Sequence, residues 1–325
     1  SFVTKNNKDM SYMFYKCINL NYLNLSSFDL IYVNNLQNMF SFCSNLTELI
    51  SPPINNKEMI IKFDEKLFHN EIEILMKVEK KDENKELIFI NSEEINELKP
   101  DLFINDIKQN NYKNIFIQNK EGEYNIKISF NGKLKSCKNM FCNCFNIKSI
   151  NLDLLNTKYV TDMSGMFKGC DNLETLFLSS FDTKEVINMS YMFGGNYNSD
   201  KNKNVGNNLK ELDLSAFDTI KVTDMSYMFS GCYNIIKINV SSFNTKNVTN
   251  MRSMFKGCER LKELNLLNFK TQNVTNMSYM FWNCKNLTNL DLSAFYAWEN
   301  TPMEKMFYGC NNFVTFSLNR SIKNC

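Results

Sequence analysis

The chain has 325 residues, 43% of them hydrophobic and 13% aromatic, with 37 Lys and Arg against 35 Asp and Glu. This apolar content excludes a disordered chain, and a formal net charge of +2 does not indicate the basic face that nucleic-acid binding uses. A single histidine, His69, excludes a metal centre built on several histidines, and no apolar run approaches the ~18 residues of a membrane span.

A repeat of 26 residues organises most of the chain. The dipeptide Met-Phe occurs nine times, and six of the eight steps between copies are 26 residues long. The other two steps, of 101 and 36 residues, each contain one insertion. The copies are Met13-Phe14, Met39-Phe40, Met140-Phe141, Met166-Phe167, Met192-Phe193, Met228-Phe229, Met254-Phe255, Met280-Phe281 and Met306-Phe307.

The insertions divide the chain. We predict repeats 1 and 2 over residues 1–51, an inserted domain over 52–132, and repeats 3 to 9 over 133–325. A second, polar insertion at 197–208 is expected to be a surface loop. Because the chain opens in the middle of a repeat, we expect the native N-terminus to lie upstream.

The first half of each unit predicts a short helix. In the unit that begins at Val222, the residues Val222, Met225, Met228 and Phe229 are spaced at i, i+3, i+6 and i+7, which is typical of one helix face. Thr223 is the expected N-cap, because its hydroxyl can accept a hydrogen bond from a free amide of the first turn.

The second half predicts a strand. Ile235, Ile238 and Val240 follow the L-x-x-L-x-L spacing of leucine-rich repeats, and the period-2 ending fits a strand with one buried face. A single unit cannot bury its apolar face alone, so stacked units must share one continuous core. We therefore predict an α/β repeat fold, a leucine-rich-repeat solenoid with one short helix and one parallel strand per coil.

The segment from Val160 to Lys184 resembles the 26-residue BspA-type leucine-rich repeat. It contains almost the whole pattern Val-Thr-x-Met-Ser-x-Met-Phe-x-Gly-Cys-x-x-Leu-x-x-Leu-x-Leu-Ser-x-Phe-Asp-Thr-Lys. That family occurs in bacterial surface proteins and lipoproteins and in surface proteins of protists. The resemblance implies a right-handed solenoid with a parallel sheet on one face, and a binding or adhesive role at a cell surface or outside the cell. It identifies no ligand.

The inserted domain has a pattern of its own. Apolar residues that alternate or run together predict strands at 72–78, 87–90, 102–104, 115–117 and 124–130. Ser92 is the expected cap of a short helical turn, which Pro100 would end. We predict a small β-rich domain that is sandwich-like or immunoglobulin-like, with a β-grasp form as the alternative.

Eight of the eleven cysteines occupy one repeat position, three residues after Met-Phe. They are Cys17, Cys43, Cys144, Cys170, Cys232, Cys258, Cys284 and Cys310. Parallel side chains on coils ~4.8 Å apart do not converge to the ~3.8 Å Cβ separation of a disulfide, so we predict a core ladder of free thiols. Cys137 is also expected in the core, whereas Cys142 and Cys325 are candidates for a disulfide.

Two columns of side chains are candidate contact surfaces. The first lies between the last two core positions of each strand and comprises Asn24, Asn151, Phe177, Asp213, Asn239, Asn265 and Asp291. Its amides and carboxylates fit either ligand recognition or a structural ladder of hydrogen-bonded side chains. The second, an aromatic column two residues after a core Met, comprises Tyr12, Tyr191, Tyr227 and Tyr279. It predicts either contacts with a partner or glycan, or packing between neighbouring turns.

Asn247 and Asn273 lie in Asn-Val-Thr sequons at one loop position and are the candidate N-glycosylation sites, if the protein passes through a eukaryotic secretory pathway. The chain has no phosphate-binding loop, dinucleotide fingerprint or nucleophile elbow, so we predict a non-enzymatic protein without metal or cofactor. The expected function is interaction or adhesion, with the sheet face presented to a protein or carbohydrate partner. The alternative is a structural protein whose copies assemble into filaments or a surface coat.

Overall fold

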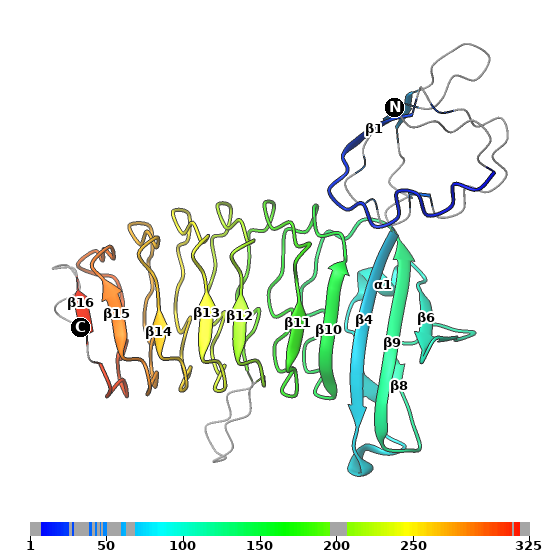
Figure 1. Cartoon of the computed structure of the whole chain (residues 1–325). Helices are drawn as coiled ribbons and strands as arrows, with labels where there is room; N and C mark the ends of the chain where they lie inside the picture. The colour runs from blue at the N-terminus through cyan, green and yellow to red at the C-terminus, as the bar shows by residue number, and fades with distance from the viewer. Residues whose placement is uncertain are drawn as a thin grey trace.

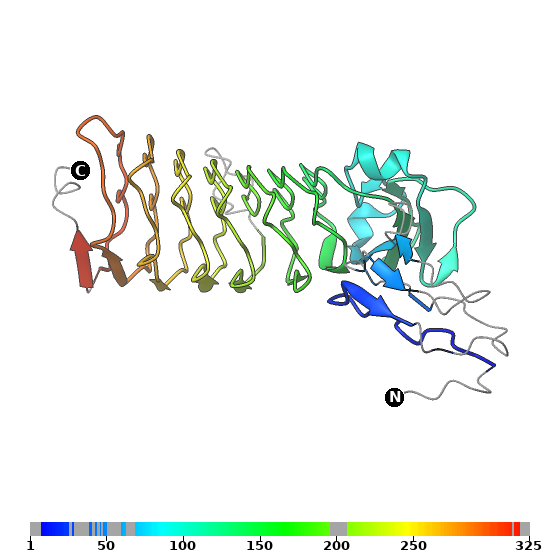
Figure 2. The same cartoon turned by 90° about the horizontal axis from the view of Figure 1, so that it is seen from above.

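The computed structural model describes residues 8–25, 28, 39–40, 43, 46, 48–50, 60–62, 69–195, 207–313 and 315–318. The polar loop predicted at 197–208 lies outside these residues except for Asn207 and Asn208, and so does Cys325. From residue 133 onward the chain forms a row of coils stacked side by side (Figure 1). Seen from above, the same coils follow one another in a nearly straight line (Figure 2).

Each coil of this stack contributes one short strand. The strands are β10 (Ile147–Leu154), β11 (Thr175–Phe177), β12 (Glu211–Asp213), β13 (Lys237–Asn239), β14 (Glu263–Leu264), β15 (Asn289–Leu292) and β16 (Thr315–Leu318). Paired strands run parallel with partners one repeat apart, such as Ser149 with Thr175 and Glu263 with Asn289. The strands form separate small sheets, because β12–β13 is a pair and β14–β15–β16 is a sheet of its own.

The helix predicted in each coil is wrong, because the described repeats consist of turns and short strands. Tyr227 and Gly231 have φ of 57° and 76°, which is the left-handed region. An α-helix of L-residues keeps every residue in the right-handed region, so it cannot contain them. The amide of Phe229 donates to the carbonyl of Met254 in the next coil at 2.9 Å, and not to a residue four positions earlier. The predicted α/β solenoid is therefore replaced by a nearly all-β stack of coils.

Successive tight turns reproduce the spacing of a helix face. The amide of Met228 donates to the carbonyl of Met225 at 3.3 Å, and that of Cys232 to Phe229 at 3.1 Å, so both bonds join residues three apart. Apolar residues three or four apart can therefore share one side of a chain of turns as well as one side of a helix. The expected cap, Thr223, instead donates its hydroxyl to the carbonyl of Ile187 in the preceding coil at 3.3 Å.

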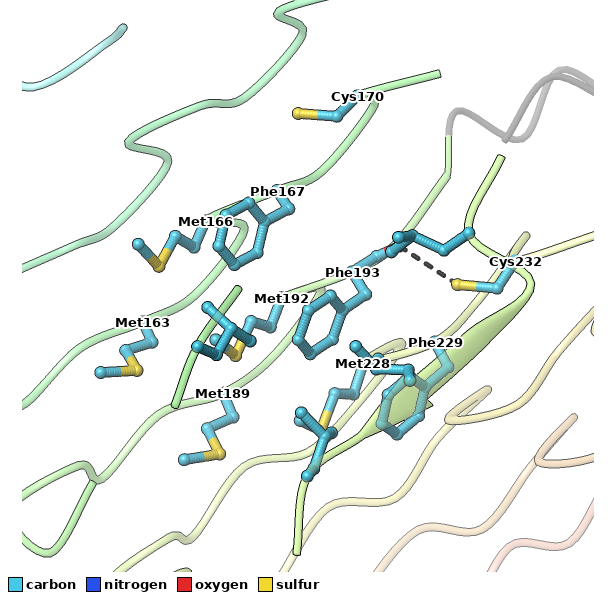
Figure 3. Packing of buried hydrophobic residues seen from close by; sticks show 14 of the residues in the cluster. Met163, Met166, Phe167, Cys170, Met189, Met192, Phe193, Met228, Phe229 and Cys232 are labelled. Carbon is cyan, nitrogen blue, oxygen red and sulfur yellow. Dashed lines mark hydrogen bonds between the residues drawn. The ribbon is translucent and has the colours of Figure 1, made fainter. Parts of the chain in front are cut away.

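The coils are held together by columns of identical buried side chains. The ring centroids of Phe167 and Phe193 are 5.5 Å apart, and those of Phe193 and Phe229 are 5.6 Å apart. Figure 3 shows these rings in a row, with Met192 and Met228 beside them. Each ring is fully buried, and burying one contributes about 1.5–3 kcal/mol to stability. One continuous apolar cluster therefore runs through the stack.

A buried threonine in five of the coils adds polar links to the apolar ones. The hydroxyl of Thr245 accepts a hydrogen bond from the amide of Lys270 at 2.7 Å and donates one to its carbonyl at 2.9 Å. The same pair of bonds to the next coil is made by Thr157, Thr183, Thr219 and Thr271. These threonines satisfy backbone groups that would otherwise be left unpaired between the coils.

The inserted segment contains the longest strands. β4 (His69–Val78) and β9 (Gly122–Asn131) pair antiparallel along their whole length. β6 (Asp101–Ile104) and β7 (Ile107–Lys108) extend this sheet, while β5 (Leu87–Ile88) and β8 (Ile115–Phe116) form a separate pair. A 3-10 turn, η2 (Lys80–Asp82), follows β4, and α1 (Glu93–Glu97) starts at Ser92, whose hydroxyl accepts from the amide of Ile95 at 3.3 Å.

The insert is not an independent sandwich or immunoglobulin-like domain, because its main sheet continues into the coil stack. β4 pairs antiparallel with β10, with Ile74 opposite Ile150, and the strand order is β11-β10-β4-β9-β6-β7. Buried residues of the insert and of the coils, such as Phe89 and Phe141, belong to one apolar cluster. β4 therefore caps the first coil of the stack.

The first two repeats form a separate unit. β1 (Tyr22–Asn24) and β2 (Glu48–Ile50) pair in parallel, and β3 (Ile60–Lys62) pairs antiparallel with β2. Met10, Leu25 and Met39 form an apolar cluster of their own. The single core expected for all nine repeats is thus divided into two: repeats 1 and 2 have a core of their own, and repeats 3 to 9 share theirs with the insert.

Candidate functional site

The outer side of the strands carries the first predicted column. Six of its residues lie in one row along the stack: Asn151, Phe177, Asp213, Asn239, Asn265 and Asp291. They face outward because successive side chains of a strand point to opposite sides, and neighbours such as Leu212 and Leu290 are buried in the core. The seventh, Asn24, lies on β1 and thus apart from the row.

Three shallow hollows follow one another along this strand face. The first, of about 370 Å³, lies over β4, β9, β10 and β11, and the second, of about 360 Å³, over β11 and β12. The third, of about 730 Å³, lies over β13 to β16. Phe177 lines both the first and the second hollow, and each residue of the row lines at least one of the three. The row is thus the shared lining of one extended surface.

The first hollow contains residues that the sequence did not point to. Glu73, Asp106 and Lys127 of the insert line it together with Asn151 of the first coil. They were missed because the insert was interpreted as a separate domain. Its alternating strands carry no signal that one of them would pair with β10.

The row is polar and internally hydrogen-bonded. The side-chain amide of Asn239 donates to Asp213 Oδ1 at 2.9 Å, and that of Asn151 donates to Glu73 Oε2 at 2.9 Å. The Ser215 amide, which donates to Asp213 at 2.9 Å, holds the pKa of that carboxyl below its ordinary value. The pKa of Asp291 is lowered in the same way by the amide of Ser293. These carboxylates are therefore ionised at neutral pH and act as acceptors.

Apolar side chains are exposed among these polar groups. Phe177 is 48% exposed, Ile236 is 39% exposed and Leu267 is 55% exposed. Phe177 belongs to the predicted column, whereas Leu267, which directly follows a core leucine, was missed. Large apolar side chains surrounded by polar ones are typical of contact surfaces, where they anchor a partner.

The aromatic column lies on the Met-Phe turns. The rings of Tyr191 and Tyr227 stack with centroids 4.4 Å apart and planes 5° apart. The hydroxyl of Tyr227 accepts from Nε of Arg252 at 2.8 Å, and the guanidinium carbon of Arg252 lies 5.0 Å from the ring centroid of Tyr279. The fourth residue, Tyr12, belongs to the first repeat and lies outside this contact chain.

Cations and further aromatic rings of this column were missed by the sequence reasoning. The Nζ of Lys256 lies 4.8 Å from the ring centroid of Trp282, which stacks on Tyr308 at 6.2 Å. On the other side, Nζ of Lys168 lies 4.7 Å from the ring of Tyr191. Lys168, Lys256, Trp282 and Tyr308 all share one repeat position, one residue after Met-Phe. That shared position was the available signal.

The cysteine column lies mostly in the core. Cys144, Cys170, Cys232, Cys258 and Cys284 are buried, Cys43 and Cys310 are half-buried, and Cys17, unlike the prediction for it, is exposed. Sγ of Cys258 donates to the carbonyl of Phe229 at 3.2 Å, and burial raises the pKa of this thiol well above its ordinary value. Among the ten cysteines of the described residues, which include the buried Cys137 and half-buried Cys142, none forms a disulfide.

The fifth repeat lacks a cysteine, and the buried Asn207, from the end of the second insertion, lies beside the cysteine of the next coil. The side-chain amide of Asn207 donates to the carbonyl of Phe193 at 3.0 Å. The same carbonyl also accepts from Sγ of Cys232 at 3.2 Å, which is the bond that the thiol of the next coil makes in the other coils. Asn207 is therefore a second donor to Phe193 at the place where the repeat was interrupted.

The candidate sequon asparagines are exposed. The side-chain amide of Asn247 donates to the carbonyl of Ile220 at 2.7 Å, and that of Asn273 donates to the carbonyl of Lys246 at 2.8 Å. A glycan on either Nδ2 would replace one hydrogen of the group that makes this bond. Modification of these residues stays a prediction.

The described residues contain neither a cluster that could hold a metal ion nor a helix that could cross a membrane. Within 8–25, 69–195, 207–313 and the shorter described pieces, no group of three or more His, Cys, Asp or Glu residues is arranged to hold a metal ion. Over those same residues, none of the helices has both the length and the apolar character needed to cross a membrane.

Comparison with known families gives one match. The model of a family described as "Mycoplasma protein of unknown function, DUF285" matches residues 1–74, 135–208 and 200–319. These segments include the Met-Phe repeats on both sides of the insert, and the chain belongs to this family. No curated protein and no solved structure shows a significant match.

Proposed function

We propose that this member of the DUF285 family is a non-enzymatic binding protein that presents the strand face of its coil stack to a protein partner. The continuous row of three hollows carries the proposal. Seven coils contribute to it, and at ~4.8 Å per step the row is about 29 Å long. That length is comparable to the side of a standard protein interface, which buries ~800 Å² on each partner.

The chemistry of the face favours a protein partner. Phe177, Ile236 and Leu267 supply exposed apolar area at separate points along the row. Lys237 and Glu263, both exposed, place opposite charges on the wall of the third hollow. Apolar anchors inside a mixed polar surround are the usual anatomy of a protein interface, and the charges give specificity more than affinity.

The location of the proposed binding follows from the repeat itself. The units resemble BspA-type repeats, whose known members are surface proteins, and this supports a place at a cell surface or outside the cell. A stack of coils with a long open face would then act in adhesion or in capture of a protein at that surface.

A protein array with single-face variants tests the proposal. Labelled wild-type protein is compared with Phe177→Ser and with the double variant Ile236→Ser/Leu267→Ser on arrays of secreted and surface proteins. Ile187→Ser is the matched control, because Ile187 is 47% exposed but lines none of the three hollows. We expect hits that both strand-face variants lose and the control keeps. Hits that survive both variants, or binding to glycan arrays alone, would contradict a protein-binding strand face.

A further inference from the structure

A second surface, on the Met-Phe turns, has a different chemistry from the strand face. We call it the aromatic–cation strip and define it by Tyr191, Tyr227, Arg252, Lys256, Tyr279 and Trp282. We propose that this strip binds an acidic polysaccharide, a linear sugar polymer that carries sulfate or carboxylate groups. The proposal does not depend on the strand-face function.

The aromatic rings hold the cations in place. Arg252 lies between two coils, with Nε 2.8 Å from the hydroxyl of Tyr227 and its guanidinium carbon 5.0 Å from the centroid of Tyr279. Lys256 Nζ lies 4.8 Å from the ring of Trp282 and 5.7 Å from that of Tyr279. Side chains already fixed in this way lose little conformational freedom when they bind an anion, so more of the contact energy remains for affinity.

The charge of the strip is predominantly positive. Arg252 and Lys256 share the ring of Tyr279, and Lys168 continues the column beyond Tyr191. Burial and the repulsion of Arg252 lower the pKa of Lys256, an effect that a bound anion would reverse. Two carboxylates lie near the strip: Glu304 accepts from the hydroxyl of Tyr279 at 2.6 Å, and the charge of Asp224 acts on Tyr191.

The backbone beneath the strip offers little to an extended peptide. The amides of Tyr227 and Phe229 donate to the carbonyls of Arg252 and Met254 in the next coil, both at 2.9 Å. Addition of a peptide strand requires free main-chain groups, so that mode of recognition is closed here. What remains is side-chain chemistry: fixed cations next to phenol hydroxyls, which complement the anionic groups and hydroxyls of a sugar polymer.

The stacking of the rings also fits a charged polymer better than a neutral one. The facing sides of the Tyr191 and Tyr227 rings cover each other at 4.4 Å, and Lys168 lies 4.7 Å from the Tyr191 ring, so these sides are not open for a sugar ring to stack on. Affinity must then come mainly from the cations, and it should fall steeply as salt is added, as it does for other polyanions.

Heparin is the probe, and the tryptophan fluorescence of the full chain, to which Trp282 of the strip and Trp298 contribute, reports binding. The test variant is Arg252→Gln/Lys256→Gln, and the matched control, Lys237→Gln/Lys262→Gln, removes the same charge from the strand face. We expect the dissociation constant for heparin to rise about tenfold or more in the strip variant and to change less than about twofold in the control. Arg252→Lys, which keeps the charge and loses the planar guanidinium, should retain most of the affinity.

Two further probes decide the class of partner. Neutral dextran should not bind, and poly-glutamate of equal charge should bind more weakly than heparin because it has no hydroxyl groups that could donate to the phenol oxygens. Equal loss of heparin binding in the strip variant and in the control would overturn the assignment of the site. Poly-glutamate that binds as tightly as heparin would overturn the polysaccharide and point to an acidic peptide. Thermal unfolding of each variant confirms that the stack is intact.

Discussion

Replacing Thr245 with valine tests whether the buried threonines hold the coils together. Thr245 is fully buried, and its hydroxyl accepts from the amide of Lys270 at 2.7 Å and donates to the carbonyl of Lys270 at 2.9 Å. Valine has nearly the same shape but neither donor nor acceptor. Both backbone groups of Lys270 would therefore lose their partner between two coils.

The expected loss can be worked out from these contacts. The two hydrogen bonds contribute about 1 kcal/mol each, and leaving the two backbone groups unsatisfied costs about 1 kcal/mol more. The additional buried methyl group offsets about 0.8 kcal/mol of this. We therefore expect Thr245→Val to lower the free energy of unfolding by about 2 kcal/mol.

Urea denaturation followed by circular dichroism measures this difference. The control is Thr249→Val, because Thr249 is exposed and its hydroxyl makes one bond, to the carbonyl of Thr223 at 3.2 Å. The control should stay within about 0.5 kcal/mol of wild type. Equal stability losses in the two variants, or no loss in Thr245→Val, would refute the view that buried hydroxyl links stabilise the stack.

Three further predictions use the same protein. Gly231→Ala should destabilise by about 1–2 kcal/mol, because φ at Gly231 is +76° and an added Cβ would lie 3.3 Å from Cα of Gly195; wild-type stability in the same urea assay would contradict this. Burial raises the pKa of Asp171 from 3.8 to about 6, so the folded carboxyl keeps a proton that the unfolded one releases, and stability should decline as pH rises across that interval. Asp171→Asn should decline less over those pH values, and melting curves that move in parallel would exclude the effect. In native protein, iodoacetamide followed by peptide mass mapping should label Cys17 quickly and spare Cys170, Cys258 and Cys284, whose pKa values are raised by burial; rapid labelling of those three would show that the core opens.

The stacking of the coils could be predicted because it rests on period and on side-chain size. A 26-residue step that repeats apolar residues at fixed positions puts identical side chains on top of each other, and Phe255 and Phe281 do stack, at 5.6 Å. The outward row followed from the same step, because alternation in a strand decides which residues face outward. The stacking of the coils and the outward row depend on the 26-residue period and on strand alternation, and not on the path of the backbone between the strands.

The helix was predicted wrongly because hydrophobic spacing does not report the sign of φ. The missed signal was a glycine or asparagine two residues after Met-Phe in most coils. Gly169, Gly257 and Asn283 at this position have φ of 70°, 73° and 58°. Both residue types enter the left-handed region at low cost, so their recurrence marks a turn that no helix can contain. Tyr227 and Tyr279 gave no such signal, because tyrosine seldom adopts positive φ.

The pairing of β4 with β10 could not be predicted for a different reason. β4 alternates the buried Ile72, Ile74 and Met76 with Glu73 and Leu75 on its other side, and such a strand can pair with any edge that offers free backbone groups. β4 pairs with β10 because of the point in the chain at which the insert leaves the repeats. The contribution of Glu73 and Lys127 to the strand face therefore appears only when the chain is folded.

The cap also constrains how copies of this chain can associate. A stack with two open ends can grow head to tail, because the first strand of one copy can accept the last strand of another. In this protein the first coil is covered, since β4 pairs antiparallel with β10 through Glu73 opposite Asn151 and Ile74 opposite Ile150. A second copy could reach β10 only by displacing β4, which also pairs along its whole length with β9. Coil-to-coil growth on β10 is thus opposed, because a second copy would have to break the pairing of β4 with both β10 and β9.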